Sequence, residues 1–462
     1  MSQQADRGRT IRARDRDAIV QSLRAGVVPR RGFHHVQVGR ADEVEAVIRD
    51  LDRIDDGGSA IRFVIGEYGS GKTFFLFLVR SIALEKGLVT AHADLAPDRR
   101  LHATGGQARL LYAELMANLA TRTRPAGGAM SSVVERFVTS TLKEARQFGS
   151  PVEEIVHQRL DDLSSLPGGY DFAEVVAAYW RGHETGDDPL QSDAIRWLRG
   201  EFTTKTEARK ALGVRTIVDD DNVYDRLKLF ARFVRLAGYQ GFLVALDELV
   251  NLYKLGSGVA RRNNYEQLLR LVNDSLQGSS VGLGFLLGGT PEMLMDPRKG
   301  LYSYEALRSR LEQNRFAGEG LKDLTGPVIH LASLSQEELY LLLEKLRHVF
   351  AAGDRQTILV PDEALRAFMR HCSERIGDAY FRTPRNTIKA FLDLLAILDQ
   401  NPTASWQQLV GQIDLAAEEN PDLQPLDNDI DDAGDVLEQG PATDLEKKAG
   451  RDSEDDLASF TL

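Results

Sequence analysis

One eight-residue segment limits the possible folds of this chain more than any other: Gly66-Glu67-Tyr68-Gly69-Ser70-Gly71-Lys72-Thr73. It matches the pattern G-x-x-x-x-G-K-[ST] without deviation, and it lies between a predicted strand, residues 60–65, and a predicted helix, residues 72–85. The glycines let the backbone curl so that its N–H groups face phosphate oxygens, and the start of the helix adds a positive end. The pattern therefore predicts a nucleotide site in which Lys72 reaches the β- and γ-phosphates and Thr73 binds Mg²⁺.

Short apolar runs alternate with helical patterns through most of the chain. The runs that we expect to form strands are residues 60–65, 88–93, 242–246, 281–287 and 327–331. Strands that alternate with helices favour a parallel sheet, so the predicted fold class is α/β. After residue 332 the pattern is helical throughout, and a capping box made by Ser335 and Glu338 predicts the start of the first of these helices.

These patterns predict six parts along the chain. They are a basic N-terminal arm at residues 1–36, the first part of a sheet domain at 37–123, a helical insertion at 124–238, the second part of the sheet domain at 239–332, a helical lid at 333–413, and an acidic, disordered tail at 414–462.

Charge is distributed unevenly along the chain, whose net charge is −12. The segment from Asp414 to the end holds 16 acidic and 3 basic residues, whereas the first 40 residues hold nine arginines and three aspartates. An arginine-rich arm fits contact with the phosphates of DNA. The tail is either a solubilising end or a segment that binds a partner or inhibits the protein by mimicking DNA.

Composition excludes several classes of protein. The single cysteine, Cys372, rules out a disulfide framework and a cysteine-based zinc site, and it fits a reducing cytoplasm. No apolar run approaches the roughly 18–20 residues needed to cross a bilayer. We therefore expect a cytoplasmic protein with no membrane partner.

Acidic and hydroxyl side chains follow two of the predicted strands. Asp247 and Glu248 directly follow the run 242–246. In a chain that also has a glycine loop upstream, the first acid would hold Mg²⁺ and the second would polarise the attacking water. A second acid indicates hydrolysis rather than binding alone. Thr290 follows the run 281–287 and would contact the γ-phosphate or the water, unless it only begins the turn before Pro291.

Three arginines are candidates for contacts with phosphate. Arg385 lies in the first turn of a predicted helix, where the helix dipole disfavours a cation and an anionic partner would offset that effect. The partner would be a nucleotide phosphate or a nearby carboxylate. Arg308 and Arg310 follow the fourth predicted strand; they would either reach the γ-phosphate of a neighbouring subunit in a homo-oligomer or lie on a solvated helix face.

The order of these features resembles that of the AAA+ ATPases, in particular their origin-recognition branch: two strands, a long interruption, three further strands and a helical lid. The segment Val38-Gly39-Arg40-Ala41-Asp42-Glu43 is similar to the opening segment of that branch. The resemblance implies that Gly39 and Arg40 lie near the adenine. Lys72 and Asp247 are 175 residues apart, more than in a compact AAA+ core, which implies that residues 124–238 are an inserted helical domain.

Several stretches resemble more narrowly the BrxD family of BREX-system ATP-binding proteins. They are residues 22–29, the glycine loop with Phe74-Phe75-Leu76 after it, Trp197-Leu198-Arg199-Gly200-Glu201, and Leu246-Asp247-Glu248-Leu249-Val250. The resemblance implies ATP and Mg²⁺ as ligands. It also implies a role in bacterial defence against phage, beside a helicase and a DNA methyltransferase.

Two functions fit these observations. The first is a DNA-associated ATPase that assembles on DNA or loads a partner in a defence complex. The second is a signalling ATPase that changes shape with its nucleotide and binds protein partners only. Salt-dependent binding of DNA by the purified protein would separate the two.

Overall fold

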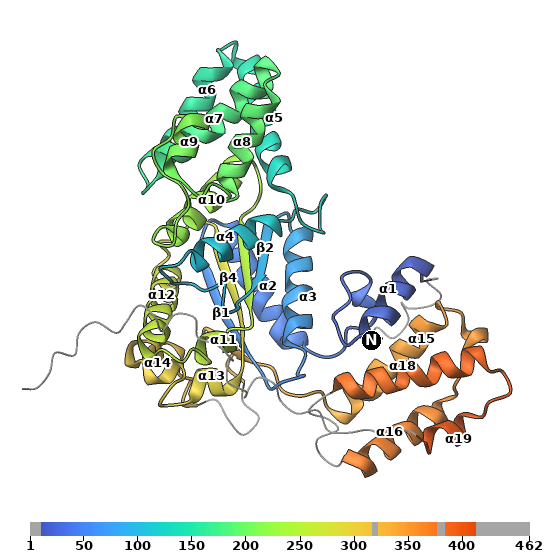
Figure 1. The fold of residues 1–462 in the computed structure, drawn as a ribbon. Helices are drawn as coiled ribbons and strands as arrows, with labels where there is room; N and C mark the ends of the chain where they lie inside the picture. The colour runs from blue at the N-terminus through green and yellow to red at the C-terminus, as the bar shows by residue number, and fades with distance from the viewer. Residues whose placement is uncertain (1–10, 317–321, 377–383, 413–462) are drawn as a thin grey trace, which may run out of the picture. The chain divides into compact units, whose positions relative to one another are not determined.

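The computed structural model describes residues 11–316, 322–376 and 384–412 (Figure 1). The acidic tail expected at 414–462 lies outside the described residues. Within these ranges, no helix combines the length and the apolar character needed to cross a membrane.

A five-stranded parallel sheet forms the centre of the fold and confirms the α/β class. Its strands are β1 (Ala60–Ile65), β2 (Val89–Asp94), β3 (Phe242–Asp247), β4 (Leu283–Gly289) and β5 (Val328–His330), and they lie in the order β2-β3-β4-β1-β5. The carboxyl ends of parallel strands meet at one edge of a sheet. This order therefore brings the glycine loop after β1, the acids at the end of β3 and Thr290 after β4 to the same edge.

Helices cover both faces of the sheet because side chains alternate along each strand. Ala60 and Val64 of β1 face α2 (Ala41–Asp55) and α3 (Lys72–Glu85). Ile61, Phe63 and Ile65 of the same strand belong to the core on the other face, which includes α4 (Gln107–Ala117), α10 (Val223–Leu236) and α12 (Gly258–Leu276). The strand is buried along its whole length, as its unbroken apolar run requires.

Five helices between α4 and α10 form a group of their own, drawn at one end of Figure 1. They are α5 (Met130–Phe148), α6 (Val152–Ser164), α7 (Gly169–Thr185), α8 (Asp188–Leu198) and α9 (Lys205–Leu212). α10 joins this group to the sheet. The ring of Phe230 lies 5.2 Å from that of Phe242 on β3, and the ring of Phe233 lies 5.3 Å from that of Phe137 on α5. We therefore propose that α10 belongs to the sheet layer and that the insertion ends before it.

The helices after the sheet pack around a separate apolar core. They are α15 (Gln336–Phe350), α16 (Asp362–Ile376), α18 (Pro384–Gln400) and α19 (Trp406–Val410). α1 (Ala13–Arg24) packs on α15 and α18, and Ile11 and Ile19 are buried in the same core. An ion pair of 2.8 Å joins Arg24 to Asp393. Residues 11–36, expected as a basic arm, thus pack against the lid, and we propose that they form one unit with it.

The expected capping box at the start of α15 is present. Ser335 Oγ accepts a bond of 3.2 Å from the Glu338 N–H, and the Glu338 carboxylate accepts one of 2.9 Å from the Ser335 N–H. Ser335→Ala removes one of these bonds and leaves a helix N–H without its cap. We expect the free energy of unfolding to fall by about 1 kcal/mol, measured by urea denaturation. Ser309→Ala, at an exposed helix position, is the control, and an equal loss in both variants would contradict the capping role.

Candidate functional site

The backbone of the glycine loop takes conformations that only glycine adopts easily. Gly69 and Gly71 have φ values of +78° and +88°, in the left-handed region, and Gly71 directly precedes the first residue of α3. A Cβ on Gly66 would lie 2.4 Å from Ser70 Oγ and 3.0 Å from the Leu331 carbonyl oxygen. The loop therefore curls tightly between β1 and α3, as the motif predicts.

Two polar side chains of the loop belong to the predicted phosphate site. Lys72 Nζ donates to the carbonyl oxygens of Gly66 and Glu67, at 2.9 and 3.0 Å, so the ammonium group lies across the loop. Ser70 Oγ is buried and has no hydrogen-bond partner among the described residues. A buried hydroxyl without a partner is costly, and a phosphate oxygen or a water at this position would satisfy it.

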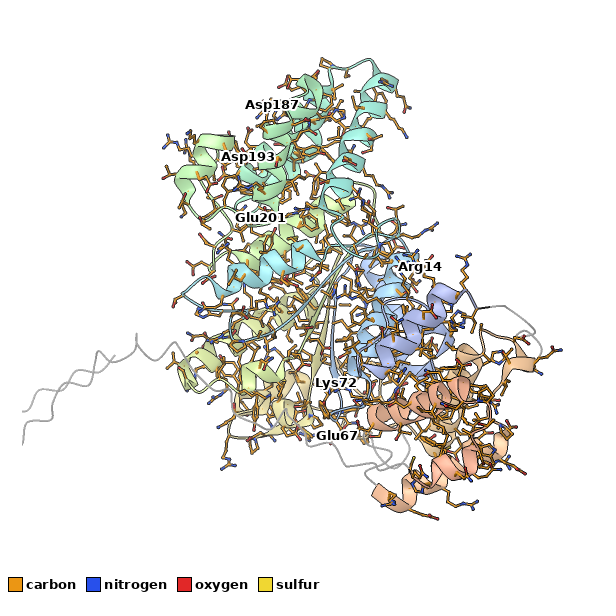
Figure 2. All side chains as sticks on the ribbon, turned by 45° about the vertical axis from the view of Figure 1, so that its right-hand side comes forward. Arg14, Glu67, Lys72, Asp187, Asp193 and Glu201 are labelled. Carbon is orange, nitrogen blue, oxygen red and sulfur yellow. The ribbon has the colours of Figure 1, made fainter. Side chains whose placement is uncertain are left out.

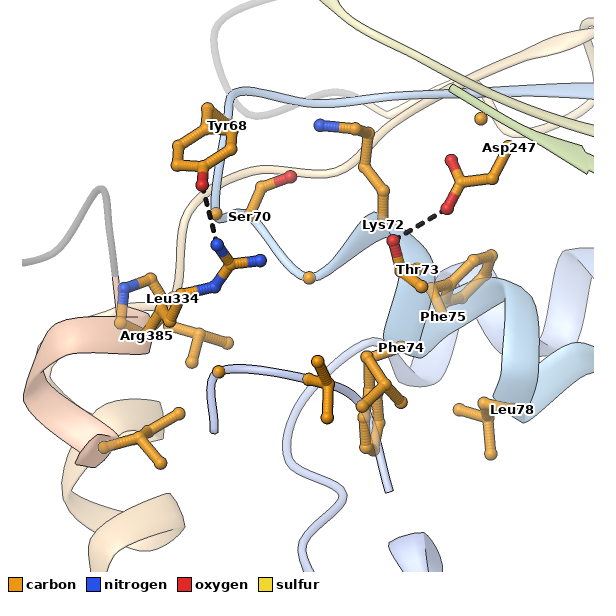
Figure 3. A pocket seen from close by; sticks show the side chains of 18 of the residues that line it. Tyr68, Ser70, Lys72, Thr73, Phe74, Phe75, Leu78, Asp247, Leu334 and Arg385 are labelled. Atoms are coloured by element: carbon orange, nitrogen blue, oxygen red, sulfur yellow. Dashed lines mark hydrogen bonds between the residues drawn. The ribbon is translucent and has the colours of Figure 1, made fainter. Parts of the chain in front are cut away.

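Thr73 and Asp247 meet directly, as Figure 3 shows. Thr73 Oγ1 donates to Asp247 Oδ2 over 2.7 Å, and Asp247 Oδ1 accepts a bond of 2.9 Å from the Glu248 N–H. Hydroxyl and carboxylate oxygens are the ligands that Mg²⁺ prefers, so this pair fits that ion. A Cβ on Gly288 of β4 would lie 2.2 Å from Asp247 Oδ1, so the neighbouring strand must carry glycine for the carboxylate to fit.

Glu248 has an unusual backbone conformation. Its φ is +58°, in the left-handed region, which costs a non-glycine residue roughly 1 kcal/mol or more. The turn places Glu248 at the carboxyl edge of the sheet directly after Asp247, and both residues line the same cavity. Strain of this kind at a site edge is typical of residues whose position serves function.

Thr290 begins a turn and also lines the cavity. Its hydroxyl caps α13 (Pro291–Met295) by accepting a bond of 3.4 Å from the Met293 N–H, so it does begin the turn before Pro291. The same residue, 2% exposed, lines the cavity beside Gly288 and Gly289.

The cavity has a volume of about 220 Å³ and runs from the glycine loop to an apolar end. Apolar side chains that line it come from α1 and the segment after it, from α3, from α11 (Val250–Tyr253), and from the lid. They are Leu23, Val27, Val28, Val36, Val38, Phe74, Phe75, Leu78, Val250, Leu334, Leu342, Pro384 and Ile388. One end of the cavity therefore offers phosphate-binding groups, and the rest offers the apolar surface that suits a purine base.

Of the two residues expected near the adenine, Arg40 lines the cavity and Gly39 does not. Arg40 lines the cavity, and its guanidinium donates to the carbonyl oxygens of Ser70, at 3.3 Å, and Ala332. Burial lowers the pKa of Arg40. Gly39 does not line the cavity but has a φ of +60°, and a Cβ there would lie 2.1 Å from an oxygen of Glu338. Gly39 thus allows the segment to pass close to the start of α15.

Arg385 lines the cavity. It extends from the first turn of α18 toward the glycine loop, and its Nη1 donates to the Tyr68 hydroxyl over 2.6 Å (Figure 3). The lid therefore contributes a cation to the site formed by the sheet.

A comparison with protein-family models identifies the family. The model of the BREX system ATP-binding protein BrxC/D matches residues 11–414. The chain belongs to the BrxC/D family. The match is to the combined family of BrxC and BrxD, and it covers the loop, the acids and the lid arginine. A comparison with curated proteins gave no match.

Arg308 and Arg310 do not line the cavity of this BrxC/D chain. Both lie on α14 (Glu305–Leu311). Arg310 donates to Asn273 Oδ1 and to the Ala306 carbonyl oxygen, each at 2.6 Å. Arg308 is half exposed and lies 3.7 Å from Glu312. Of the two, Arg308 is the more available for a contact with another subunit, since the partners of Arg310 fix its side chain.

Two features of the site were missed from the sequence of this BrxC/D protein. Asp94 ends β2 directly beside Asp247 in the sheet register. Loss of hydration at its carboxyl group, and then the charge of Asp247, raise the pKa of Asp94. The position of Asp94 at the end of a predicted strand is the sequence signal that could have indicated it. The second feature is the apolar wall from residues 27 and 28, for which sequence patterns gave no indication.

Proposed function

We propose that this chain is the BrxD-type ATPase of a bacterial BREX anti-phage system and hydrolyses ATP with Mg²⁺ in the AAA+ manner. The observation that carries the proposal is the bond between Thr73 and Asp247 at the end of a glycine loop, in a cavity that Glu248 also lines. The residues that bind the phosphates, hold the metal and orient the water are thus on one edge of the sheet.

Each group has a distinct role in this proposal. The loop N–H groups and Lys72 bind the phosphates, and the apolar end of the cavity takes the adenine. Thr73 and Asp247 hold Mg²⁺, which neutralises charge on the phosphate oxygens when bound. Glu248 orients the attacking water, and Thr290 contacts that water or the γ-phosphate. Arg385 binds a nucleotide phosphate.

Release of phosphate from ATP by the purified full chain tests the proposal. We expect turnover in the presence of Mg²⁺ and its loss when EDTA removes the ion, because Thr73 and Asp247 bind the phosphates only through the metal. ATP binding without turnover under all conditions would favour the nucleotide switch. Failure to bind ATP at all would overturn both functions.

We also propose that the protein acts in the cytoplasm on DNA, with a defence helicase or methyltransferase as partner, and as a homo-oligomer in which Arg308 faces the nucleotide of the next subunit. α1 supports the DNA contact, because Arg12 and Arg14 are exposed next to a packed helix face (Figure 2 shows Arg14). The alternative, a switch that binds proteins only, requires no such surface.

Arg12→Gln with Arg14→Gln tests the DNA contact without truncation, which would remove Ile11 from the lid core. Each phosphate contact adds about 0.9 to the slope of log affinity against log salt. We expect the double variant to bind duplex DNA more weakly, with a slope flatter by up to about two units. Arg366→Gln with Arg370→Gln, an exposed pair on α16, is the charge-matched control.

Two results would contradict this contact. If the α1 variant and the control lose the same affinity, the effect is one of net charge. If the wild-type protein binds no DNA at low salt, the protein-only function gains support.

A further inference from the structure

We propose that Tyr68 is a positioning residue that holds Arg385 of the lid at the phosphate loop before the nucleotide arrives. The inference rests on the proposed function, since it concerns the same site, and it adds a role that the loop motif does not specify. Tyr68 occupies one of the four variable positions of that motif.

Tyr68 contacts Arg385 in two ways. The Tyr68 hydroxyl accepts a bond of 2.6 Å from Arg385 Nη1, and the guanidinium carbon lies 5.4 Å from the centre of the tyrosine ring. A cation at this distance from an aromatic ring is attracted to it. Figure 3 shows the guanidinium below the hydroxyl, beside Ser70 and across the loop from the pair of Thr73 and Asp247.

The stem of Arg385 also lies close to the N-terminal segment, although the residue is exposed. Gly26 has a φ of +73°, and a Cβ there would lie 3.4 Å from Arg385 Cδ. The ion pair between Arg24 and Asp393 ties this N-terminal segment to α18, the helix that carries Arg385. Gly26, Tyr68 and Arg385 line the same cavity. The stem of the arginine therefore lies between the segment after α1 and the glycine loop.

This arrangement lowers the entropy cost of using an arginine to bind a phosphate. A long arginine side chain loses many rotamers when it binds a ligand, and the start of α18 disfavours a cation. Fixing the guanidinium in advance reduces the first cost at the moment of binding. A guanidinium has five N–H donors, so it can keep the bond to Tyr68 while it donates to a phosphate oxygen.

A double-mutant cycle tests the inference. Affinity for a non-hydrolysable ATP analogue is measured by calorimetry on the full chain for wild type, Tyr68→Phe, Arg385→Ala and the double variant. Phenylalanine keeps the ring and removes only the acceptor. We expect Tyr68→Phe to weaken binding by up to about tenfold in the wild-type background, because the arginine must then be immobilised on binding. The change should be less than about twofold when Arg385 is absent. Tyr170→Phe, at a side chain that is 66% exposed, should change nothing in either background.

Three results would overturn the inference. An equal loss in both backgrounds would mean that Tyr68 acts on the nucleotide by itself. Unchanged affinity of Tyr68→Phe would mean that the bond has no effect on binding. Tighter binding would mean that Tyr68 competes with the phosphate for the arginine. If the wild-type protein does not bind the analogue, the proposed function fails and the inference fails with it; the other three results leave the proposed function intact.

Discussion

Lys72→Ala is expected to abolish tight binding of ATP, with an affinity at least about a hundredfold below that of the wild type. The ammonium group of Lys72 is the loop's one side-chain charge that can reach the β- and γ-phosphates. It lies across the loop, on the carbonyl oxygens of Gly66 and Glu67, within the phosphate site that we propose. Calorimetric titration with ATP and Mg²⁺ measures the effect.

Lys86→Ala provides the control, because Lys86 follows the same helix at its other end and pairs with Asp52 on the surface. Its affinity for ATP should match that of the wild type. The melting temperature of nucleotide-free Lys72→Ala shows whether the loop still folds. A folded Lys72→Ala variant with wild-type affinity would overturn the assignment of the site.

Glu248→Gln is expected to leave ATP bound but to slow its hydrolysis by about a hundredfold or more, the range typical of losing a catalytic acid or base. The amide has nearly the same shape as the carboxylate, and glutamine can take the same left-handed backbone conformation, so we expect the fold to be retained. It cannot orient and polarise water as a carboxylate does. Steady-state phosphate release gives the rate, and titration gives the affinity.

Glu266→Gln, an exposed position on α12, should have no effect on either quantity. Wild-type turnover by Glu248→Gln would show that another group orients the water. Asp94 would then be the next candidate, because it lies beside Asp247 at the same edge of the sheet.

The sequence predicted the sheet well because its strands are short, continuous apolar runs bounded by turns. The runs at 242–246 and 281–287 lie within two residues of β3 and β4. The loop and the acids could be located for a related reason. Their chemistry requires fixed residue types, and these follow directly after the apolar strands. Contacts between distant segments carry no such local pattern.

The position of α1 illustrates this limit. Ile19 is buried, and Val20 and Leu23 pack beside it, but arginines and aspartates fill most of the first half of α1. The apolar positions therefore span only about one turn, which is too short a stretch to indicate a packed helix. The boundary of the insertion at residue 238 stays a prediction, because helical periodicity does not say which neighbour a helix such as α10 packs against. Gly288 must be glycine because of the Asp247 side chain on the adjacent strand. The local sequence around Gly288 contains no sign of that contact.

The packing of α1 against α18 affects how the protein is made. Arg24 and its partner Asp393 are 369 positions apart, so a ribosome must add nearly the whole described fold between them. At typical synthesis rates of about 5–20 residues per second, this takes roughly 20–70 seconds. During that time the sheet can form, but the nucleotide cavity still lacks the side chains of α18: Pro384, Arg385 and Ile388. The nascent chain therefore acquires its glycine loop early and its complete nucleotide cavity only after α18 has been made.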